Sequence, residues 1–318
     1  MFKIAFIKEA CYQDLWIGDN KDTSSDLIRS TLLRTGPVGL LEIFGSDFFI
    51  VKSNNSRAAQ KIEAYFPDLG EYDEFREPFI GGGSVAIYIT KKFPHLDIWV
   101  NDLYKPLANF WQQLQEKPDQ ITKELARLKG RYDTPERARH LFAECKECLN
   151  HTNSGKSSRA VRFYIVNKCS FSGLSESSSF SSQASDSNFS MRGIEKLPGY
   201  SEIIRDWKIT NLSYTDLMDN SKDCFMYLDP PYMIKDKLYG KNGSMHGKFS
   251  HRVFADNCQH NESDMLVSYN CDQLIKDRFN GWSVVEYDHT YTMRSTASYG
   301  KDQQERKELL LLNYDCRL

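Results

Sequence analysis

From about residue 58 onward, the chain alternates between short apolar runs and longer amphipathic stretches. Short apolar runs bounded by polar residues are typical of buried strands, whereas apolar positions three and four apart are typical of helices. The pattern predicts helices at 58–66 and 84–93, and strands at 73–79, 96–101, 207–212, 224–228, 265–269, 282–287 and 308–314. Buried strands interleaved with helices indicate a mostly parallel sheet covered on both faces, so the predicted fold class is α/β.

Helical patterns dominate residues 103–166, which is too long for a simple crossover between adjacent strands. Pro106, Pro118 and Pro135 each stand where a helix can begin, since proline is tolerated in the first turn. Residues 170–190 follow, and eleven of these twenty-one residues are serine, which predicts a loop. We therefore expect a sheet domain made of residues 46–104 and 206–318, interrupted by a helical insertion at 105–205. Residues 1–45 have weak periodicity and receive no role.

The bulk composition is that of a soluble globular protein, with 40% hydrophobic residues, 26% charged residues and a formal net charge of -2. This balance neither supports nor excludes nucleic-acid binding, because phosphate contacts need only a local positive face. No apolar run reaches the roughly 18 residues that a membrane span requires. The first residues also lack the small-residue cleavage pattern of a signal peptide. We therefore expect a soluble cytoplasmic protein.

The eight cysteines are scattered, and we expect them to be reduced thiols. Cys145 and Cys148 form a CxxC pair within a stretch that reads as a helix, and no second pair stands at the spacing of a structural zinc site. A further set of candidate ligands also lacks metal-site spacing: His246, His251, Cys258 and His260. The sequence predicts no metal.

A glycine-rich loop, EPFIGGGS at 77–84, joins a predicted strand to a predicted helix. Glycines there let the backbone approach a ligand closely, and the helix N-terminus that follows favours negative charge. Asp102 ends the next predicted strand, where a carboxylate can accept hydrogen bonds from the hydroxyls of a ribose. The alternatives are a tight turn without a ligand and a carboxylate that caps a helix. Together the two features favour an adenosine-containing ligand.

A second loop, formed by Asp229, Pro230, Pro231 and Tyr232, directly follows the apolar run at 224–228. An aromatic amine is a poor nucleophile, but a carboxylate and a backbone carbonyl that accept its two hydrogens can aim its lone pair at an electrophile. The two prolines hold this loop rigid, and the tyrosine offers a ring on which an extruded base can stack. The loop alone predicts methylation of some planar nitrogen.

In their order along the chain, these motifs resemble those of the Dam-type DNA adenine methyltransferases, in which the cofactor motif precedes the recognition region and the DPPY motif follows it. The resemblance covers roughly residues 55–314, through segments at 79–83, 101–102, 167–173, 238–243, 268–270 and 308–314. It implies a Rossmann-like sheet that binds S-adenosylmethionine and carries an inserted helical target-recognition region. It also implies double-stranded DNA as the partner, and it leaves open whether a cognate restriction endonuclease exists.

The resemblance implies a role for each matching residue. Asp229, Pro230 and Tyr232 would hold the target adenine, and Asp229 would also contact the cofactor. Asp102 would hold the cofactor ribose, and the loop that contains Phe79, Gly81 and Gly83 would hold its methionine end. In the insertion, the basic residues expected to meet DNA phosphates are Arg159, Arg162 and Lys168, although charge on a helix is more often a solvated face.

The chain departs from the family at the Gly-Gly-Lys motif whose lysine contacts the cofactor. The comparable segment here is SNNSR at 53–57, so either Lys52 or Arg57 replaces that lysine or cofactor binding is weaker. Two rival functions stay open: methylation of cytosine N4 or a protein glutamine, and DNA binding without catalysis. Asp229 favours adenine over the first rival, because those relatives more often carry Ser or Asn at that position. The intact loop argues against the second.

Overall fold

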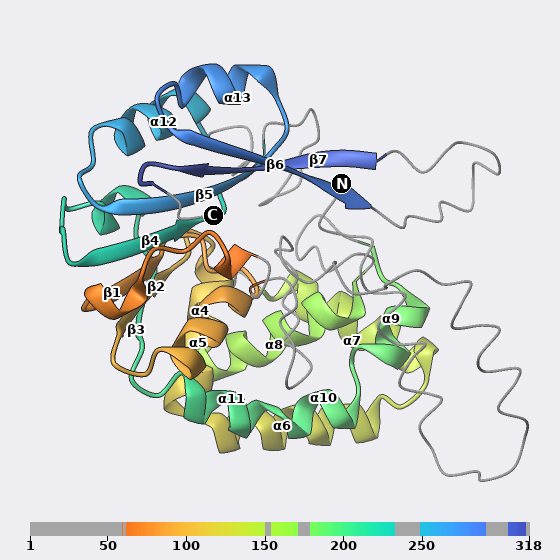
Figure 1. Cartoon of the computed structure of the whole chain (residues 1–318). Helices are drawn as coiled ribbons and strands as arrows, with labels where there is room; N and C mark the ends of the chain where they lie inside the picture. The colour runs from red at the N-terminus through yellow and green to blue at the C-terminus, as the bar shows by residue number, and fades with distance from the viewer. Residues whose placement is uncertain are drawn as a thin grey trace, which may run out of the picture.

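The computed structural model describes residue 59 and residues 62–149, 154–170, 179–232, 249–290 and 305–315, with only the backbone at 287–290 and 305–307. In this part of the chain, seven strands form one sheet in the order β3-β2-β1-β4-β5-β7-β6 (Figure 1). The strands are β1 (Glu74–Glu77), β2 (Asp97–Asn101), β3 (Lys208–Thr210), β4 (Cys224–Leu228), β5 (Asp264–Asn270), β6 (Ser283–Thr290) and β7 (Glu305–Leu312). The predicted α/β class with a Rossmann-like sheet is confirmed.

Strands β3, β2, β1, β4 and β5 run parallel, whereas β7 pairs antiparallel with both β5 and β6. All the predicted strands are present, but β2 begins one residue later than expected, and β1 and β3 are each three residues shorter. Strand β1 ends before Pro78, which has no N–H to donate to a ladder. Strand β3 stops at Thr210, because the N–H of Leu212 donates to the side chain of Asn101 instead of to a neighbouring strand.

Side chains alternate along the strands and build a separate core on each face of the sheet. Phe225 and Tyr227 of β4 join a core with helices α4 (Ser84–Lys92) and α5 (Lys105–Glu116). Met226 and Leu228 join another core with helices α12 (His251–Gln259) and α13 (Gln273–Arg278), which cover the opposite face in Figure 1. The sheet is therefore buried on both sides, as the near-continuous apolar runs predict.

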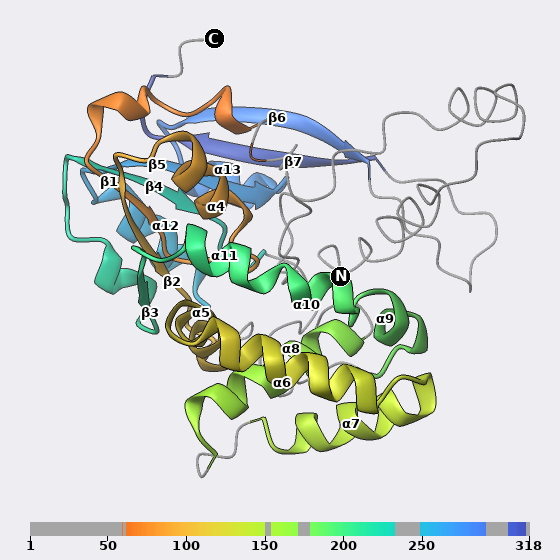
Figure 2. The same ribbon diagram turned by 90° about the horizontal axis from the view of Figure 1, so that it is seen from below.

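The helical insertion predicted after β2 is present and lies to one side of the sheet (Figure 2). Its further helices are α6 (Pro118–Arg131), α7 (Pro135–Glu147), α8 (Lys156–Cys169), α9 (Ser182–Ser187), α10 (Met191–Glu195) and α11 (Leu197–Ile203). Pro106, Pro118 and Pro135 stand in the first turns of α5, α6 and α7, as predicted. Two short 3-10 turns, η2 (Leu69–Glu71) and η4 (Tyr214–Leu217), lie before β1 and β4.

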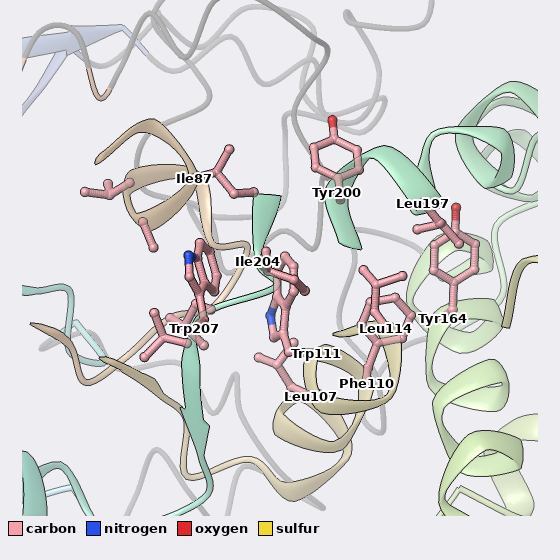
Figure 3. Close-up of a cluster of buried hydrophobic side chains, with 14 of the residues drawn as sticks. Ile87, Leu107, Phe110, Trp111, Leu114, Tyr164, Leu197, Tyr200, Ile204 and Trp207 are labelled. Atoms are coloured by element: carbon pink, nitrogen blue, oxygen red, sulfur yellow. The ribbon is translucent and has the colours of Figure 1, made fainter. Parts of the chain in front are cut away.

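One continuous core joins the sheet to the insertion (Figure 3). Trp111 of α5 packs on Trp207 beside β3, with ring centroids 6.1 Å apart, and Phe110 stacks on Tyr164 of α8 at 5.8 Å. The indole N–H of Trp207 donates to the hydroxyl of Thr90 on α4. Helix α5 thus packs against both the sheet domain and the rest of the insertion, so the two are firmly coupled.

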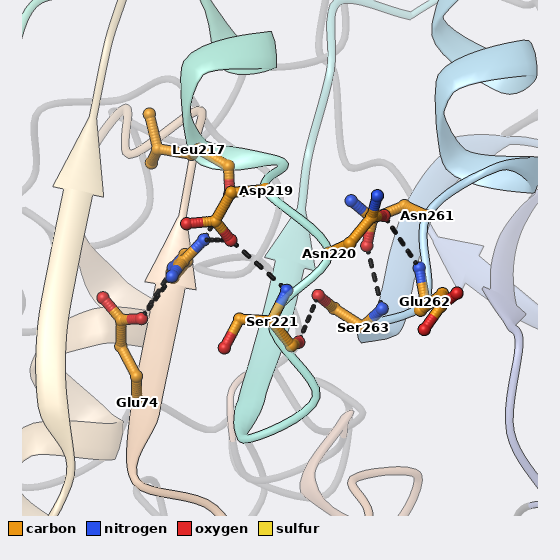
Figure 4. A network of polar contacts seen from close by, with 9 residues as sticks. Glu74, Leu217, Asp219, Asn220, Ser221, Asn261, Glu262 and Ser263 are labelled. Atoms are coloured by element: carbon orange, nitrogen blue, oxygen red, sulfur yellow. Dashed lines mark hydrogen bonds and ion pairs between the residues drawn. The ribbon is translucent and has the colours of Figure 1, made fainter.

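At the amino ends of β1 and β4, the guanidinium of Arg76 is buried between two carboxylates. It donates to Glu74 at 2.5 and 2.8 Å, to Asp219 at 2.5 Å and to the carbonyl of Leu217 at 2.7 Å. Figure 4 shows how this network continues through Ser221 to Ser263, whose hydroxyl donates to the carbonyl of Ser221. Burial lowers the pKa of Arg76, but the bonds to Glu74 and Asp219 outweigh it and raise the pKa overall. The amino edge of the sheet is therefore held together by paired charges.

Candidate active site

Both loops singled out in the sequence lie at the carboxyl edge of the sheet. The glycine loop follows β1, and the Asp229 loop follows β4. Strands β1 and β4 are direct neighbours in the sheet. Ligands of open α/β sheets bind at this edge, outside the carboxyl ends of the strands. The fold thus brings together two segments that are about 150 residues apart in the sequence.

The glycine loop follows a path that side chains would obstruct. Gly81 and Gly83 have φ values of 47° and 70°, in the left-handed region that glycine tolerates best. A Cβ atom added to Gly83 would lie 2.9 Å from the ring of Trp111, and the indole N–H of Trp111 donates to the carbonyl of Gly81. The loop therefore rests directly on the insertion's first helix and presents bare backbone at the sheet edge.

Asp102 joins the glycine loop to the end of β2. Its Oδ2 accepts a hydrogen bond from the N–H of Gly81 at 3.3 Å, and its Oδ1 accepts one from the N–H of Tyr104 at 2.8 Å. Helix α5 begins at Lys105, so the carboxylate supports the turn into that helix as well as the glycine loop. Asp102 does not cap α5, because the N-cap is Tyr104 and no side chain caps the helix. Its contact with a ribose stays a prediction, which is compatible with these bonds because each carboxylate oxygen carries two lone pairs.

Glu77, at the end of β1, is a site residue that the sequence analysis missed. Its carboxylate is buried and accepts a hydrogen bond at 2.9 Å from the N–H of Ala86, in the first turn of α4. The N-terminus of α4, which was predicted to favour a negatively charged ligand, thus already binds a negatively charged side chain of the protein, the carboxylate of Glu77. A carboxylate directly before a proline, at the end of the strand that leads into the glycine loop, was the available signal.

Asp229 is half-buried at the end of β4, and its Oδ1 accepts a hydrogen bond at 2.9 Å from the hydroxyl of Ser268 on β5. The hydroxyl of Tyr227 donates in turn to the Ser268 oxygen at 3.3 Å. Burial, and then the charge of Asp229, raises the pKa of Tyr227 well above its ordinary value, so that phenol stays protonated. The sequence motif at 268–270 contained Ser268, but it did not reveal this contact.

Tyr232 lies at the other end of the loop and is only 4% exposed. Its hydroxyl donates to the buried carboxylate of Glu308 on β7 at 2.9 Å, and its ring stacks on Tyr269 with centroids 6.0 Å apart. The hydroxyl of Tyr269 is hydrogen-bonded to His251 at 2.6 Å. In this arrangement the Tyr232 ring is packed into the protein, and base stacking on it stays a prediction.

Between these two ends, Pro230 is buried and Pro231 is half-buried, and no cis peptide bond occurs in the described ranges. Asn270 ends β5 on the same side of the strand as Ser268. Among the described residues, no donor reaches its buried Oδ1 atom. An orphaned buried acceptor costs free energy unless a ligand supplies a donor, so its place at this edge fits a ligand site.

Phe79, predicted to lie at the cofactor, is half-buried on the α12 face of the sheet. Its ring stacks on Tyr214 with centroids 5.5 Å apart and meets Phe254 edge-on at 5.9 Å. These contacts anchor the glycine loop from the side opposite Trp111. Its contact with a cofactor stays a prediction.

The three predicted phosphate contacts lie on α8. Arg159 and Arg162 are half-buried, whereas Lys168 is 6% exposed and its ammonium lies over the ring of Tyr164 at 5.6 Å. DNA contact by all three stays a prediction, and the burial of Lys168 argues against a phosphate contact there. Helix α8 packs against α5 and α7, so most of its C-terminal half is core.

Several predictions fall outside the described residues: the SNNSR segment at 53–57, the motif at 238–243, His246 and residues 171–178 of the serine-rich segment. The prediction of a loop over all of 170–190 is wrong, because α9 (Ser182–Ser187) lies within it, capped by the side chain of Ser181. Cys145 lies in α7, where burial raises its pKa to about 12, and Cys148 caps that helix. Within the described ranges, no three His, Cys, Asp or Glu side chains are grouped to hold a metal ion. None of the helices described has the length and apolar character needed to cross a membrane.

Comparison with known proteins adds two findings to this geometry. The family model described as D12 class N6 adenine-specific DNA methyltransferase matches residues 54–293. The type II methyltransferase M.MjaIII of Methanocaldococcus jannaschii is 22% identical over 178 residues, which is 53% of this chain and 61% of that protein. The chain thus matches about three fifths of the length of this curated relative.

Proposed function

The chain belongs to the D12 class of N6 adenine-specific DNA methyltransferases, and from that premise we propose that it methylates adenine N6 within a specific duplex sequence, with S-adenosylmethionine as donor. The target base would be extruded from the duplex and receive the methyl group by direct in-line transfer. One observation carries this proposal: Asp229 ends β4 beside the glycine loop, in a loop anchored at both ends by buried side chains.

The chemistry asked of the loop is to make a poor nucleophile reactive. We assign Asp229 and the carbonyl of Pro230 as the two acceptors for the hydrogens of the adenine amino group. With both hydrogens held, the nitrogen becomes more tetrahedral and its lone pair points away from the ring, which is a positioning effect. An adenine within a duplex cannot reach such a pocket, so extrusion must come first. S-adenosylmethionine, when bound, supplies the electrophilic methyl carbon.

The residues at the carboxyl edge fit this donor. Gly81 and Gly83 have left-handed φ values that favour glycine, and a side chain at Gly83 would clash with Trp111. The N–H of Gly81 donates to Asp102, which places this loop directly beside that carboxylate. We assign Asp102 to the ribose of the donor and the glycine loop to its methionine end, with Asp229 also contacting it. We further assign Glu77 and Asn270 to the ammonium of the donor, because Glu77 carries a carboxylate at this edge and the Oδ1 atom of Asn270 is a buried acceptor that no described donor reaches.

DNA is the substrate of the family, and we propose that the insertion at 105–205 reads its sequence. We assign Arg159 and Arg162 of α8 to phosphate contacts, and their partly exposed side chains support this assignment. The name of the M. jannaschii relative describes a type II methyltransferase. We accordingly propose that this chain acts in a restriction-modification system, alongside a cognate endonuclease.

The proposal is tested with the purified full chain, duplex DNA and labelled S-adenosylmethionine. We expect label on N6-methyladenine, and we expect Asp229→Ala to lower the rate about a hundred- to a thousand-fold, as loss of one preorganised catalytic group does. Asp277→Ala, at an exposed carboxylate on α13, is the matched control and should keep full activity.

Label on cytosine or on protein glutamine would refute the adenine assignment. Equal rates for wild type and Asp229→Ala would refute the role of the loop. Binding of duplex DNA without any transfer, together with no binding of S-adenosylmethionine in calorimetry, would replace the proposal by DNA binding without catalysis.

A further inference from the structure

We propose that Ser268 is a positioning residue for Asp229, and that Tyr227 holds Ser268 in place for this purpose. This inference rests on the proposed function, since it assigns Asp229 the task of holding the adenine amino group. The catalytic machinery would then include two buried residues of the sheet in addition to the four residues of the loop. Neither residue belongs to the loop itself.

The register of the sheet brings Ser268 to the loop. Leu228 of β4 pairs with Val267 of β5, so the next residue on each strand is Asp229 and Ser268. Strand β4 ends at this point, whereas β5 continues to Asn270. Asp229, the first residue of the catalytic loop, thus lies beside strand β5. The hydroxyl of Ser268 on that strand donates to the Asp229 carboxylate at 2.9 Å.

The donors and acceptors allow one direction for this chain of hydrogen bonds. An ionised carboxylate can only accept, so the single hydroxyl hydrogen of Ser268 must point at Asp229. The Ser268 oxygen then accepts from the hydroxyl of Tyr227 at 3.3 Å. Ser268 is 0% exposed and Tyr227 is 1% exposed, so water does not compete for either bond.

Fixing one carboxylate oxygen also fixes the other. The carboxyl group is planar, and the bond to Ser268 restricts its rotation about Cβ–Cγ, so the directions of both oxygens are set before a base arrives. Adenine must be held with its amino group aligned to the methyl carbon, and small misplacements of a catalytic group are costly. A hydroxyl donor orients Asp229 without neutralising its charge, as a cationic partner would.

The test compares four variants of the full chain by their methylation rates at saturating DNA and S-adenosylmethionine. We expect Ser268→Ala to lower kcat about tenfold or more, in the range for a hydrogen bond to a charged group, while the KM for S-adenosylmethionine changes little. Ser263→Ala is the matched control: its hydroxyl is also 0% exposed and donates to a backbone carbonyl, but at the opposite end of β5. It should keep the wild-type kcat.

Tyr227→Phe should lower kcat by a smaller factor, about two- to fivefold, because it removes a neutral hydrogen bond. If Tyr227 acts through Ser268, adding Tyr227→Phe to Ser268→Ala should lower kcat little further, so the double variant should have nearly the kcat of Ser268→Ala alone. A purely structural role would give losses that multiply and that follow the loss of thermal stability. Such a result, or an unchanged kcat in Ser268→Ala, would overturn the inference.

Crystal structures of wild type and Ser268→Ala give a readout that does not depend on methylation. The Asp229 carboxylate should have one orientation in wild type and a rotated or divided one in the variant. A wild-type enzyme that fails to methylate adenine would refute the proposed function, whereas an unmoved Asp229 carboxylate in Ser268→Ala would refute the positioning role alone.

Discussion

The two edges of the sheet both contain buried polar groups, but the groups have different kinds of partner. At the amino edge, Arg76 is buried between the carboxylates of Glu74 and Asp219. At the carboxyl edge, hydroxyl groups donate to the carboxylates of Asp229 and Glu308, at 2.9 Å in both cases. The first arrangement pairs opposite charges, and the second orients negative charges through neutral donors.

This difference separates stability from chemistry. Paired charges at the amino edge connect β1 to the segments that precede β4 and β5, so their loss should weaken the fold. A carboxylate held by a hydroxyl keeps its charge for a ligand, while its direction is fixed. Substitutions at the amino edge should therefore lower the free energy of unfolding, and those at the carboxyl edge should lower the rate beyond any loss of stability.

Arg76→Ala should have the largest effect on stability. It leaves two carboxylates without their cation and removes the guanidinium that lies 4.9 Å from the centroid of Trp99. Breaking a buried ion pair costs about 3 kcal/mol or more, and the partial exposure of Asp219 and Glu74 places the expected loss at the low end of that range. Urea denaturation measures it, and kcat at 20 °C, about the temperature of maximum stability, should match wild type. A kcat that falls as steeply as in Ser268→Ala would contradict the separation of the two edges.

Tyr232→Phe should have an intermediate effect on stability and a clear effect on rate. The variant removes the hydroxyl that donates to buried Glu308, which should cost about 1 to 3 kcal/mol of unfolding free energy. Because Tyr232 ends the catalytic loop, kcat should fall more than in Arg76→Ala, although the fold loses less stability. Denaturation and initial rates, measured on the same preparations, test both parts.

Glu308→Gln is the conservative partner of that variant, since it keeps an acceptor for the tyrosine hydroxyl. It should cost less stability than Tyr232→Phe and retain more of the rate. A larger rate loss in Glu308→Gln would mean that the charge of Glu308, rather than its hold on Tyr232, matters at the carboxyl edge.

Local patterns in the sequence predicted most of the elements. The run Cys224–Leu228 is a strand over its full predicted length, because five buried residues between polar ones leave few alternatives. The three prolines mark helix starts for an equally local reason, which is their missing N–H and fixed φ. The direction of β7 was not predictable, since four consecutive leucines indicate burial but not which neighbours the strand pairs with.

The partners of the catalytic loop were beyond local reasoning. Asp229 and Ser268 are 39 positions apart, and Tyr232 and Glu308 are 76 apart. Only the order and register of the strands bring each pair together, and neither can be read from periodicity. Lys168 shows a different limit on α8. Its spacing of four residues from Tyr164 puts both side chains on one helix face, but the pattern did not reveal that this part of the helix is buried in the core.

The smallest expected effect lies at the exposed end of the amino-edge network. The hydrogen bond from Arg76 lowers the pKa of Asp219 below its ordinary value, although burial opposes this. A carboxyl group whose folded-state pKa is lowered contributes stability above its unfolded pKa, about 3.9, and loses it as the pH falls through the folded value. The side chain is 53% exposed, so solvent screening limits the contribution to less than about 1 kcal/mol. Asp219→Asn should therefore lower Tm slightly at pH 7, and the difference from wild type should vanish as the pH falls below the lowered folded-state pKa of Asp219. A difference that persists in acid would show that Asp219 acts by packing rather than by charge, and would leave Glu74 as the ionic partner of Arg76 that stabilises this edge.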